Sequence, residues 1–136
     1  MPDFHVNYLA VGAAVLATLT IGAFWYSPLL FGDLWLVSHG YSVDDLQKMA
    51  GRILMVSVLC YAVMAYMLAV LISVVGASTA LQGALLGILV WFGFMATLGM
   101  TTHLLSGNTW MIYIIDTGYQ LAYVVLMCVI PARWSQ

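Results

Sequence analysis

Four apolar stretches constrain this chain more than any other feature. They cover about residues 6–26, 52–75, 81–102 and 110–130. Roughly 20 apolar residues, each rising 1.5 Å along a helix, cross the ~30 Å hydrocarbon core of a bilayer. Hydrophobic residues make up 65% of the chain and charged residues 6%, whereas soluble domains average roughly 45–50% and 25%. So few charges cannot cover a water-facing surface. We therefore predict an all-α integral membrane four-helix bundle, with residues 1–136 as a single four-span transmembrane domain.

The first span ends in an aromatic connection, which runs from Gly22 to Gly32. Tryptophan and tyrosine favour the bilayer–water interface, so Trp25 and Tyr26 are predicted to lie level with the lipid headgroups. Ser27 and Pro28 are typical of an N-cap and a first helical residue. They predict a short interfacial helix over about residues 28–37, too short to cross the membrane. An aromatic anchor followed by a turn is the simpler interpretation of this connection, and a ligand or lipid site is the alternative.

Capping residues predict the other helix ends. The apolar spacing allows the second helix to begin at Val43, well before its span. Ser78 or Thr79 is expected to cap the third span, and Pro131 is expected to close the fourth. Trp134 follows as a further interface anchor.

Small residues recur at four-residue spacing on two spans. Gly22 ends such a series in the first span, after Ala10, Ala14 and Thr18. The third span carries Gly83 and Gly87 as a GxxxG motif, followed by a second series that begins at Gly93. Small residues on one helix face let a neighbouring backbone approach closely, so these glycines are predicted to be packing positions. With the small size of the chain, they suggest a homo-oligomer or a subunit docked on a larger membrane complex.

Asp116 is the one acidic or basic side chain clearly inside a span. Placing a carboxylate in the bilayer centre costs at least ~2.5 kcal/mol, so Asp116 should face protein, water or a subunit contact. The spacing of Tyr113, Asp116, Gln120 and Tyr123 puts all four on one helix face, with Thr117 adjacent.

Two interpretations of this polar stripe compete. It could line a proton or solute path in which Asp116 titrates. It could instead be structural, with Asp116 held by hydroxyl groups of other helices. The structural interpretation is the simpler one, because no second acid and no base lies in the spans to complete a relay. His103 is interpreted as an interfacial histidine.

Other chemistry finds little support in the sequence. No nucleophile elbow, zinc-protease motif, phosphate-binding loop or catalytic carboxylate pair is present. Cys60 and Cys128 lie singly in apolar runs and are expected to be packing residues. We predict no catalytic residue, no metal site and no cofactor. The absence of a basic run argues against nucleic acid as a partner. The lipid bilayer is a predicted partner.

Four segments carry a resemblance to a known family. They are Asn7–Ala10, Gly22–Gly32 with its Trp-Tyr-Ser-Pro-Leu-Leu-Phe-Gly run, Trp91–Thr97, and Asp116–Gln120. On these segments the chain resembles the small bacterial membrane proteins grouped as "domain of unknown function 1761". The resemblance implies a four-helix integral membrane protein of the bacterial inner membrane, and it implies no activity.

Three functions follow from these observations. The first is a non-enzymatic subunit or packing module of a membrane assembly. The second is a small oligomeric channel or transporter that uses the stripe from Tyr113 to Tyr123, and the third is a membrane enzyme or cofactor-binding protein. Because Lys48 and Arg52 lie in the first connection, the distribution of basic residues predicts that both termini lie outside.

Overall fold

The computed structural model describes residues 6–27, 30, 32, 34, 43–107 and 110–134. Within these residues the chain is helical and contains no strand. Helix α1 spans Tyr8–Trp25, α3 spans Val43–Val75 and α6 spans Trp110–Trp134. The third apolar helix, Ala80–Ser106, consists of α4 (Ala80–Val90), a π-helical segment η1 (Trp91–Ala96) and α5 (Thr97–Ser106). Four helices are thus long and apolar enough to cross a membrane, which confirms the predicted all-α four-helix class.

Helix ends follow the capping residues in part. Asn7, which we included in the first span, instead caps α1, and its Oδ1 accepts hydrogen bonds from Leu9 N and Ala10 N. Thr79 caps α4 by accepting from Gln82 N at 3.1 Å. Gly107 ends α5 with a φ of 71°, a left-handed conformation that glycine adopts without strain.

The fourth helix differs from the prediction at Pro131. It does not close there but continues to Trp134 with Pro131 inside it. A proline removes one backbone donor, and in the last turn that loss affects a single hydrogen bond. Both Pro131 and Ala132 are buried against the bundle, so packing holds the chain helical past the proline.

The proposed interfacial helix falls mostly on residues outside the described ranges, Pro28 among them. Of the described residues, Leu30 N and Gly32 N donate to the carbonyl oxygen of Ser27 at 3.1 and 2.9 Å. The helix over residues 28–37 stays a prediction.

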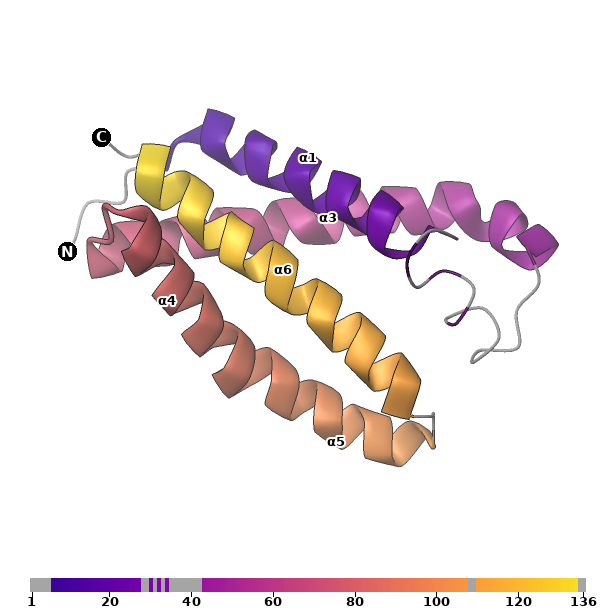
Figure 1. The fold of residues 1–136 in the computed structure, drawn as a ribbon. Helices are drawn as coiled ribbons and strands as arrows, with labels where there is room; N and C mark the ends of the chain where they lie inside the picture. Colours follow the sequence, from indigo (N-terminus) through magenta and orange to yellow (C-terminus); the bar gives the residue numbers. More distant parts are fainter. Residues whose placement is uncertain are drawn as a thin grey trace.

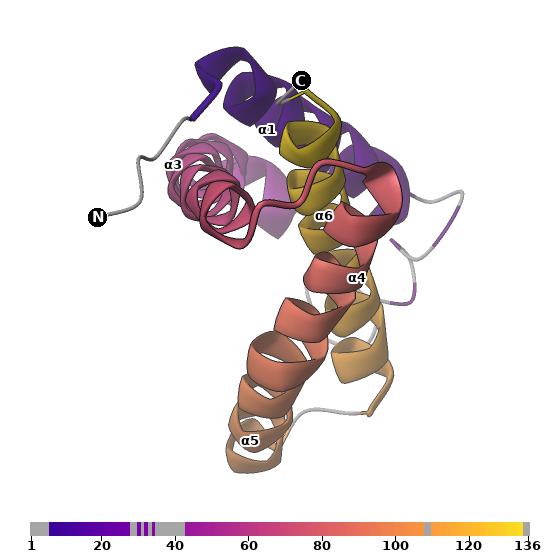
Figure 2. The same cartoon turned by 90° about the vertical axis from the view of Figure 1, so that its left-hand side faces the viewer.

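Helix α6 lies at the centre of the fold. It packs against α1, α3 and α4, and α1 also packs against α3. Figure 2 shows α1 and α3 on one side of α6 and α4 on the other. In its most apolar stretch α6 buries 44% of its residues, whereas the other helices bury 17–22%. The core is therefore built around one central helix, and the outer faces of the other three expose large apolar side chains.

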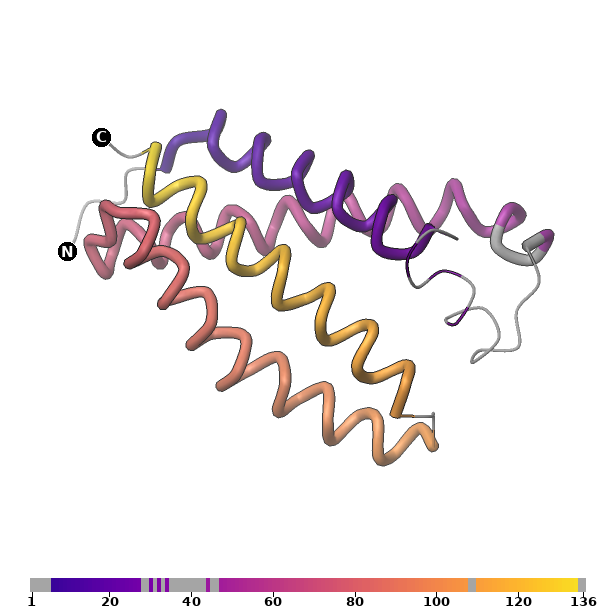
Figure 3. The backbone as a smooth tube through the Cα atoms, in the orientation of Figure 1, coloured from indigo at the N-terminus to yellow at the C-terminus, as the bar shows by residue number. Residues whose placement is uncertain are grey.

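Helices α5 and α6 diverge from α1 and α3 toward one end of the molecule. The Ser106 end of α5 and the Trp110 end of α6 incline away from α1 and α3 (Figure 1). Figure 3 shows α4, η1 and α5 as one continuous path beside α6. At the opposite end, the start of α1 and the end of α6 lie near the turn between α3 and α4.

Most of the predicted packing glycines contact helix α6. A Cβ atom on Gly83 would lie 2.8 Å from Cys128 O, and one on Gly87 would lie 2.9 Å from Val125 Cα. A Cβ on Gly22 would meet the Tyr119 hydroxyl oxygen at 2.6 Å.

Gly93 behaves differently from the other three. A Cβ there would meet no described atom within 4 Å, so the packing role predicted for Gly93 is not found within the described chain. The first small-residue face is also internal, since Ala10, Ala14 and Thr18 are buried. The faces that suggested an oligomer are thus largely used inside the chain.

Candidate functional site: a polar pocket beside the central helix

Two tryptophans hold the middle of α6 from opposite sides. Trp25, at the end of α1, donates its Nε1–H to Ile115 O at 3.0 Å. Trp91, the first residue of η1, donates its Nε1–H to Thr117 O at 2.9 Å. A backbone carbonyl has two lone pairs, so each can accept an indole N–H besides its helical partner. The carbonyls on both sides of Asp116 are therefore tied to neighbouring helices.

Asp116 itself is held from α1. Tyr26, which caps that helix, donates its hydroxyl to Asp116 Oδ1 at 2.6 Å. Charge-assisted O–H···O bonds of this length are among the stronger hydrogen bonds in proteins. The aromatic residues that end the first span thus also fix the only Asp, Glu, Lys or Arg side chain between residues 53 and 132 of the sequence.

Small residues on α1 and α6 make room for these contacts. A Cβ on Gly118 would lie 3.1 Å from Trp25 Cζ2, so the indole ring packs directly on the α6 backbone. Gly22 similarly faces the ring of Tyr119. A glycine on each of the two helices therefore permits the close approach of an aromatic ring.

A cluster of tyrosines lies next to Asp116 in the core. Tyr119 contacts the ring of Tyr26 edge-on, with centroids 5.3 Å apart, and its hydroxyl donates to Thr18 O at 2.9 Å. Tyr123 contacts Tyr119 and Tyr61, with centroids 5.0 and 5.2 Å apart. This cluster of Tyr26, Tyr61, Tyr119 and Tyr123 fills the space between α1, α3 and α6.

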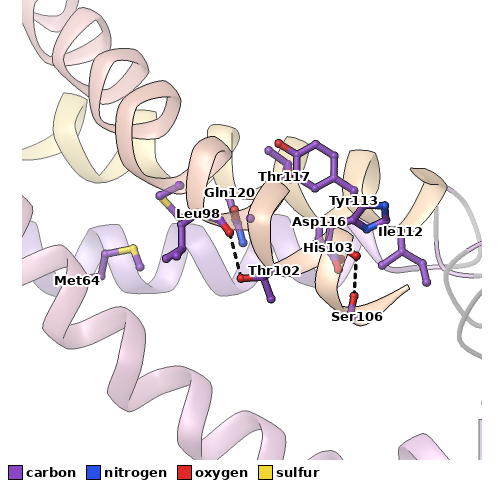
Figure 4. Close-up of a pocket in the computed structure, with 12 residues that line it drawn as sticks. Met64, Leu98, Thr102, His103, Ser106, Ile112, Tyr113, Asp116, Thr117 and Gln120 are labelled. Carbon is purple, nitrogen blue, oxygen red and sulfur yellow. Dashed lines mark hydrogen bonds between the residues drawn. The ribbon is translucent and has the colours of Figure 1, made fainter. Parts of the chain in front are cut away.

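A pocket of about 490 Å³ lies on another side of α6, between α3, α5 and α6. Its polar lining consists mainly of Thr102, His103, Tyr113, Asp116, Thr117 and Gln120, and Figure 4 shows their side chains. Met64 of α3, Met95 and Leu98 supply apolar lining. Asp116 lies six residues past Trp110, or about 9 Å along the helix, so the pocket lies near the α5–α6 turn, beside a helix long and apolar enough to cross a membrane.

The polar stripe of α6 is therefore divided in two. Tyr113, Asp116, Thr117 and Gln120 line the pocket. Tyr123 does not line it and is buried in the tyrosine cluster. The stripe is continuous along the helix, but one end faces a cavity and the other faces packed aromatic rings.

The interface residues have distinct surroundings. Trp25 and Tyr26 are partly buried on α6, while Trp134 is exposed at the helix end. Ser27 Oγ donates to Phe24 O at 2.6 Å, so this hydroxyl closes the end of α1. Pro28 lies outside the described residues.

Sequence reasoning missed two residues of the site. His103 is buried, with its ring 4.8 Å from that of Trp110 and 5.5 Å from that of Tyr113. Trp91 belongs to one of the family segments, where no contact was predicted for it, and it donates to Thr117 O. In an antiparallel hairpin, residues equally distant from the turn face each other, so the pairing of His103 with Tyr113 could have been found. Nothing in the sequence indicates the partner of Trp91.

The described residues contain no group of three or more His, Cys, Asp or Glu side chains that could hold a metal ion. Cys60 and Cys128 are free and lie on different helices.

Fold and site together define the class: a multi-pass membrane protein of four apolar helices, with an acid-containing pocket beside its central helix. The family model described as "Protein of unknown function (DUF1761)" matches residues 9–131. The chain belongs to this family, which confirms the resemblance seen in its sequence. No curated protein and no solved structure matches the chain.

Proposed function

We propose that this protein binds a small polar solute at the pocket and acts as a small channel or transporter. The observation that carries the proposal is the position of Asp116, an acid within a helix long and apolar enough to cross a membrane, which lines a cavity of about 490 Å³. Ligand pockets typically measure roughly 300–1,000 Å³ and combine an apolar lining with a few convergent polar groups. An ionisable residue inside a span is costly, and such residues commonly mark solute or ion pathways.

The tyrosine cluster gives the pathway a direction. The pocket lies toward the α5–α6 turn, whereas Tyr123 and Tyr119 pack in the core beyond Asp116. A solute that enters from the turn side would reach Asp116 and Gln120 before it meets these rings. Passage beyond Asp116 then requires the rings to move, as in carriers whose binding site faces one side at a time.

A homo-oligomer or a subunit of a larger membrane complex is the second candidate. The exposed face at Gly93 supports it, since a Cβ there would meet no described atom within 4 Å. Thr97 and Thr101 continue this face, and their hydroxyls donate to backbone oxygens of their own helix. A close helix partner could be accepted there without leaving a hydroxyl unpaired. A location in the bacterial inner membrane with both termini outside stays part of the proposal.

Flux through reconstituted protein tests the proposed function. Proteoliposomes that enclose a pH-sensitive dye, under a potassium diffusion potential, report proton entry, and ion-sensitive dyes report monovalent cations. We expect flux above that of empty liposomes and a decrease of about tenfold in Asp116→Asn.

The matched control for this experiment is Asp44→Asn, because Asp44 is exposed at the start of α3. This variant should retain the flux of the unaltered protein. Equal flux through Asp116→Asn and Asp44→Asn would remove Asp116 from the pathway and with it the proposal.

A further inference from the structure

The π-helical segment η1 determines which face of α5 meets the central helix. Trp91, the first residue of η1, donates to Thr117 O on α6. His103 of α5 lies against the ring of Tyr113, one turn earlier on α6. His103 comes twelve positions after Trp91, and in a regular α-helix this separation would amount to three turns and about 120° more. A π turn contains one residue more than an α turn, which removes about 100° of that difference and brings both side chains to α6.

Side-chain hydroxyls donate to carbonyl oxygens of η1. The Thr97 hydroxyl lies 3.0 Å from Gly93 O and 3.2 Å from Phe94 O, so it can donate to either. The Tyr113 hydroxyl of α6 donates to Ala96 O at 2.8 Å. Where a π turn rejoins an α-helix, the backbone pairing changes from i+5 to i+4, and a carbonyl there needs another donor. The two hydroxyls therefore stabilise the π form relative to a regular α-helix.

Helix α5 is held more loosely than α4. A Cβ on Gly83 or Gly87 of α4 would lie 2.8 or 2.9 Å from backbone atoms of α6, so α4 is fixed by close packing. Of residues 91–106, all of which the structure describes, only His103 is buried. A Cβ on Gly93 would meet no described atom within 4 Å. Little packing within the described chain therefore opposes a rotation of α5 about its own axis while α4 stays in place.

We propose that η1 is a switch that opens and closes the pocket by changing between the π-helical form and a regular α-helix. Loss of the π turn rotates α5 by about 100° relative to α4, so each pocket-facing position passes to the preceding residue. Leu98 then takes the place of Gly99, where even an added Cβ would lie 3.4 Å from Tyr113 Cε2. The larger side chain closes the space beside Tyr113 and His103 leaves the pocket, so the π form is the open one. As the regulation of the solute site, this inference rests on the proposed function.

Relaxation-dispersion NMR of backbone amides tests the switch in ¹⁵N-labelled protein in nanodiscs, because it detects exchange on the μs–ms timescale of helix register shifts. We expect exchange in α5, residues 97–106, and none in α4, residues 80–90. Deletion of Gly93 removes the extra residue of the π turn, so a regular α-helix then holds His103 at the pocket. The exchange in α5 should be lost in this variant.

Two threonines provide a matched pair of variants that keep the length of the chain. Thr97 and Thr101 each donate to the carbonyl four residues earlier, at 3.0 and 3.1 Å, but only the acceptor of Thr97 lies in η1. Thr97→Val should raise the ratio of the α-helical to the π form about twofold to tenfold, the range for one lost hydrogen bond. Thr101→Val should leave this ratio unchanged. Circular dichroism of each variant checks that the helices are retained.

Several outcomes would overturn the inference. The absence of exchange in α5 would show a single form, and equal exchange in α4 and α5 would show motion of the whole helix instead of a switch at η1. Exchange that persists after deletion of Gly93, or equal ratios in Thr97→Val and Thr101→Val, would show that the π turn is not its cause. If the deletion variant does not fold, the threonine pair decides. The flux experiment decides the proposed function separately, because it depends on Asp116 and not on η1.

Discussion

Replacing Gly87 by alanine tests whether the GxxxG face packs inside the chain. The added Cβ would lie 2.9 Å from Val125 Cα and 3.3 Å from Val124 O. Both are backbone atoms of α6 and cannot rotate away, so α4 would have to move off the central helix. Overpacking of this kind costs about 1–3 kcal/mol, while alanine gains up to about 1 kcal/mol over glycine in a helix. We expect Gly87→Ala to lower the free energy of unfolding by about 1 kcal/mol.

Gly93→Ala is the matched control, because a Cβ at Gly93 would meet no described atom within 4 Å. It shares the helix-propensity gain but lacks the overpacking, so it should be neutral or more stable by up to about 1 kcal/mol. The difference between the two variants then isolates the overpacking cost, about 1–3 kcal/mol.

Unfolding in mixed micelles, titrated with sodium dodecyl sulfate and followed by circular dichroism, measures both variants. Equal stability of Gly87→Ala and Gly93→Ala would refute the packing of α4 on α6. If Gly87→Ala instead dissociated an oligomer and left the stability of the monomer unchanged, the GxxxG face would belong to a partner.

Two further substitutions test the contacts that hold α6. Tyr26→Phe removes the hydroxyl bound to Asp116 and should lower the free energy of unfolding by about 1.5–3 kcal/mol, whereas Tyr8→Phe, on a side chain that is 74% exposed, should be neutral in the same titration. Trp91→Phe removes the Nε1–H bound to Thr117 O and should lower the free energy of unfolding by about 1 kcal/mol. If either variant loses no more stability than Tyr8→Phe, the contact that it removes is contradicted.

The helices could be predicted from the sequence because their cause is local. A long apolar stretch in lipid must satisfy its backbone hydrogen bonds internally, and a single helix does so without help from the rest of the chain. The ends of the helices were harder to predict, because only a few interactions fix each end. Asn7 and Pro131 act through one or two hydrogen bonds each, and neighbouring packing decides which side of the boundary they occupy.

The partners of α6 could not be predicted in the same way. Periodicity places Asp116 on a face but does not say which helix meets that face. The contacts from Trp25 to Ile115 and from Tyr26 to Asp116 each join residues 90 positions apart. They depend on how α1 lies across α6, which follows from the fit of Gly22 and Gly118 to aromatic rings rather than from any local pattern.

The contacts of Asp116 fit both interpretations of the polar stripe, the structural one and the solute path. Tyr26 holds Oδ1, as expected of a structural residue, while the same side chain lines a pocket with Gln120 and Thr117, as expected of a binding residue. The hydrogen bond from Tyr26 fixes the orientation of this carboxylate beside the pocket. The aromatic connection after the first span, predicted to be a headgroup anchor, thus also positions the acid of the proposed solute site.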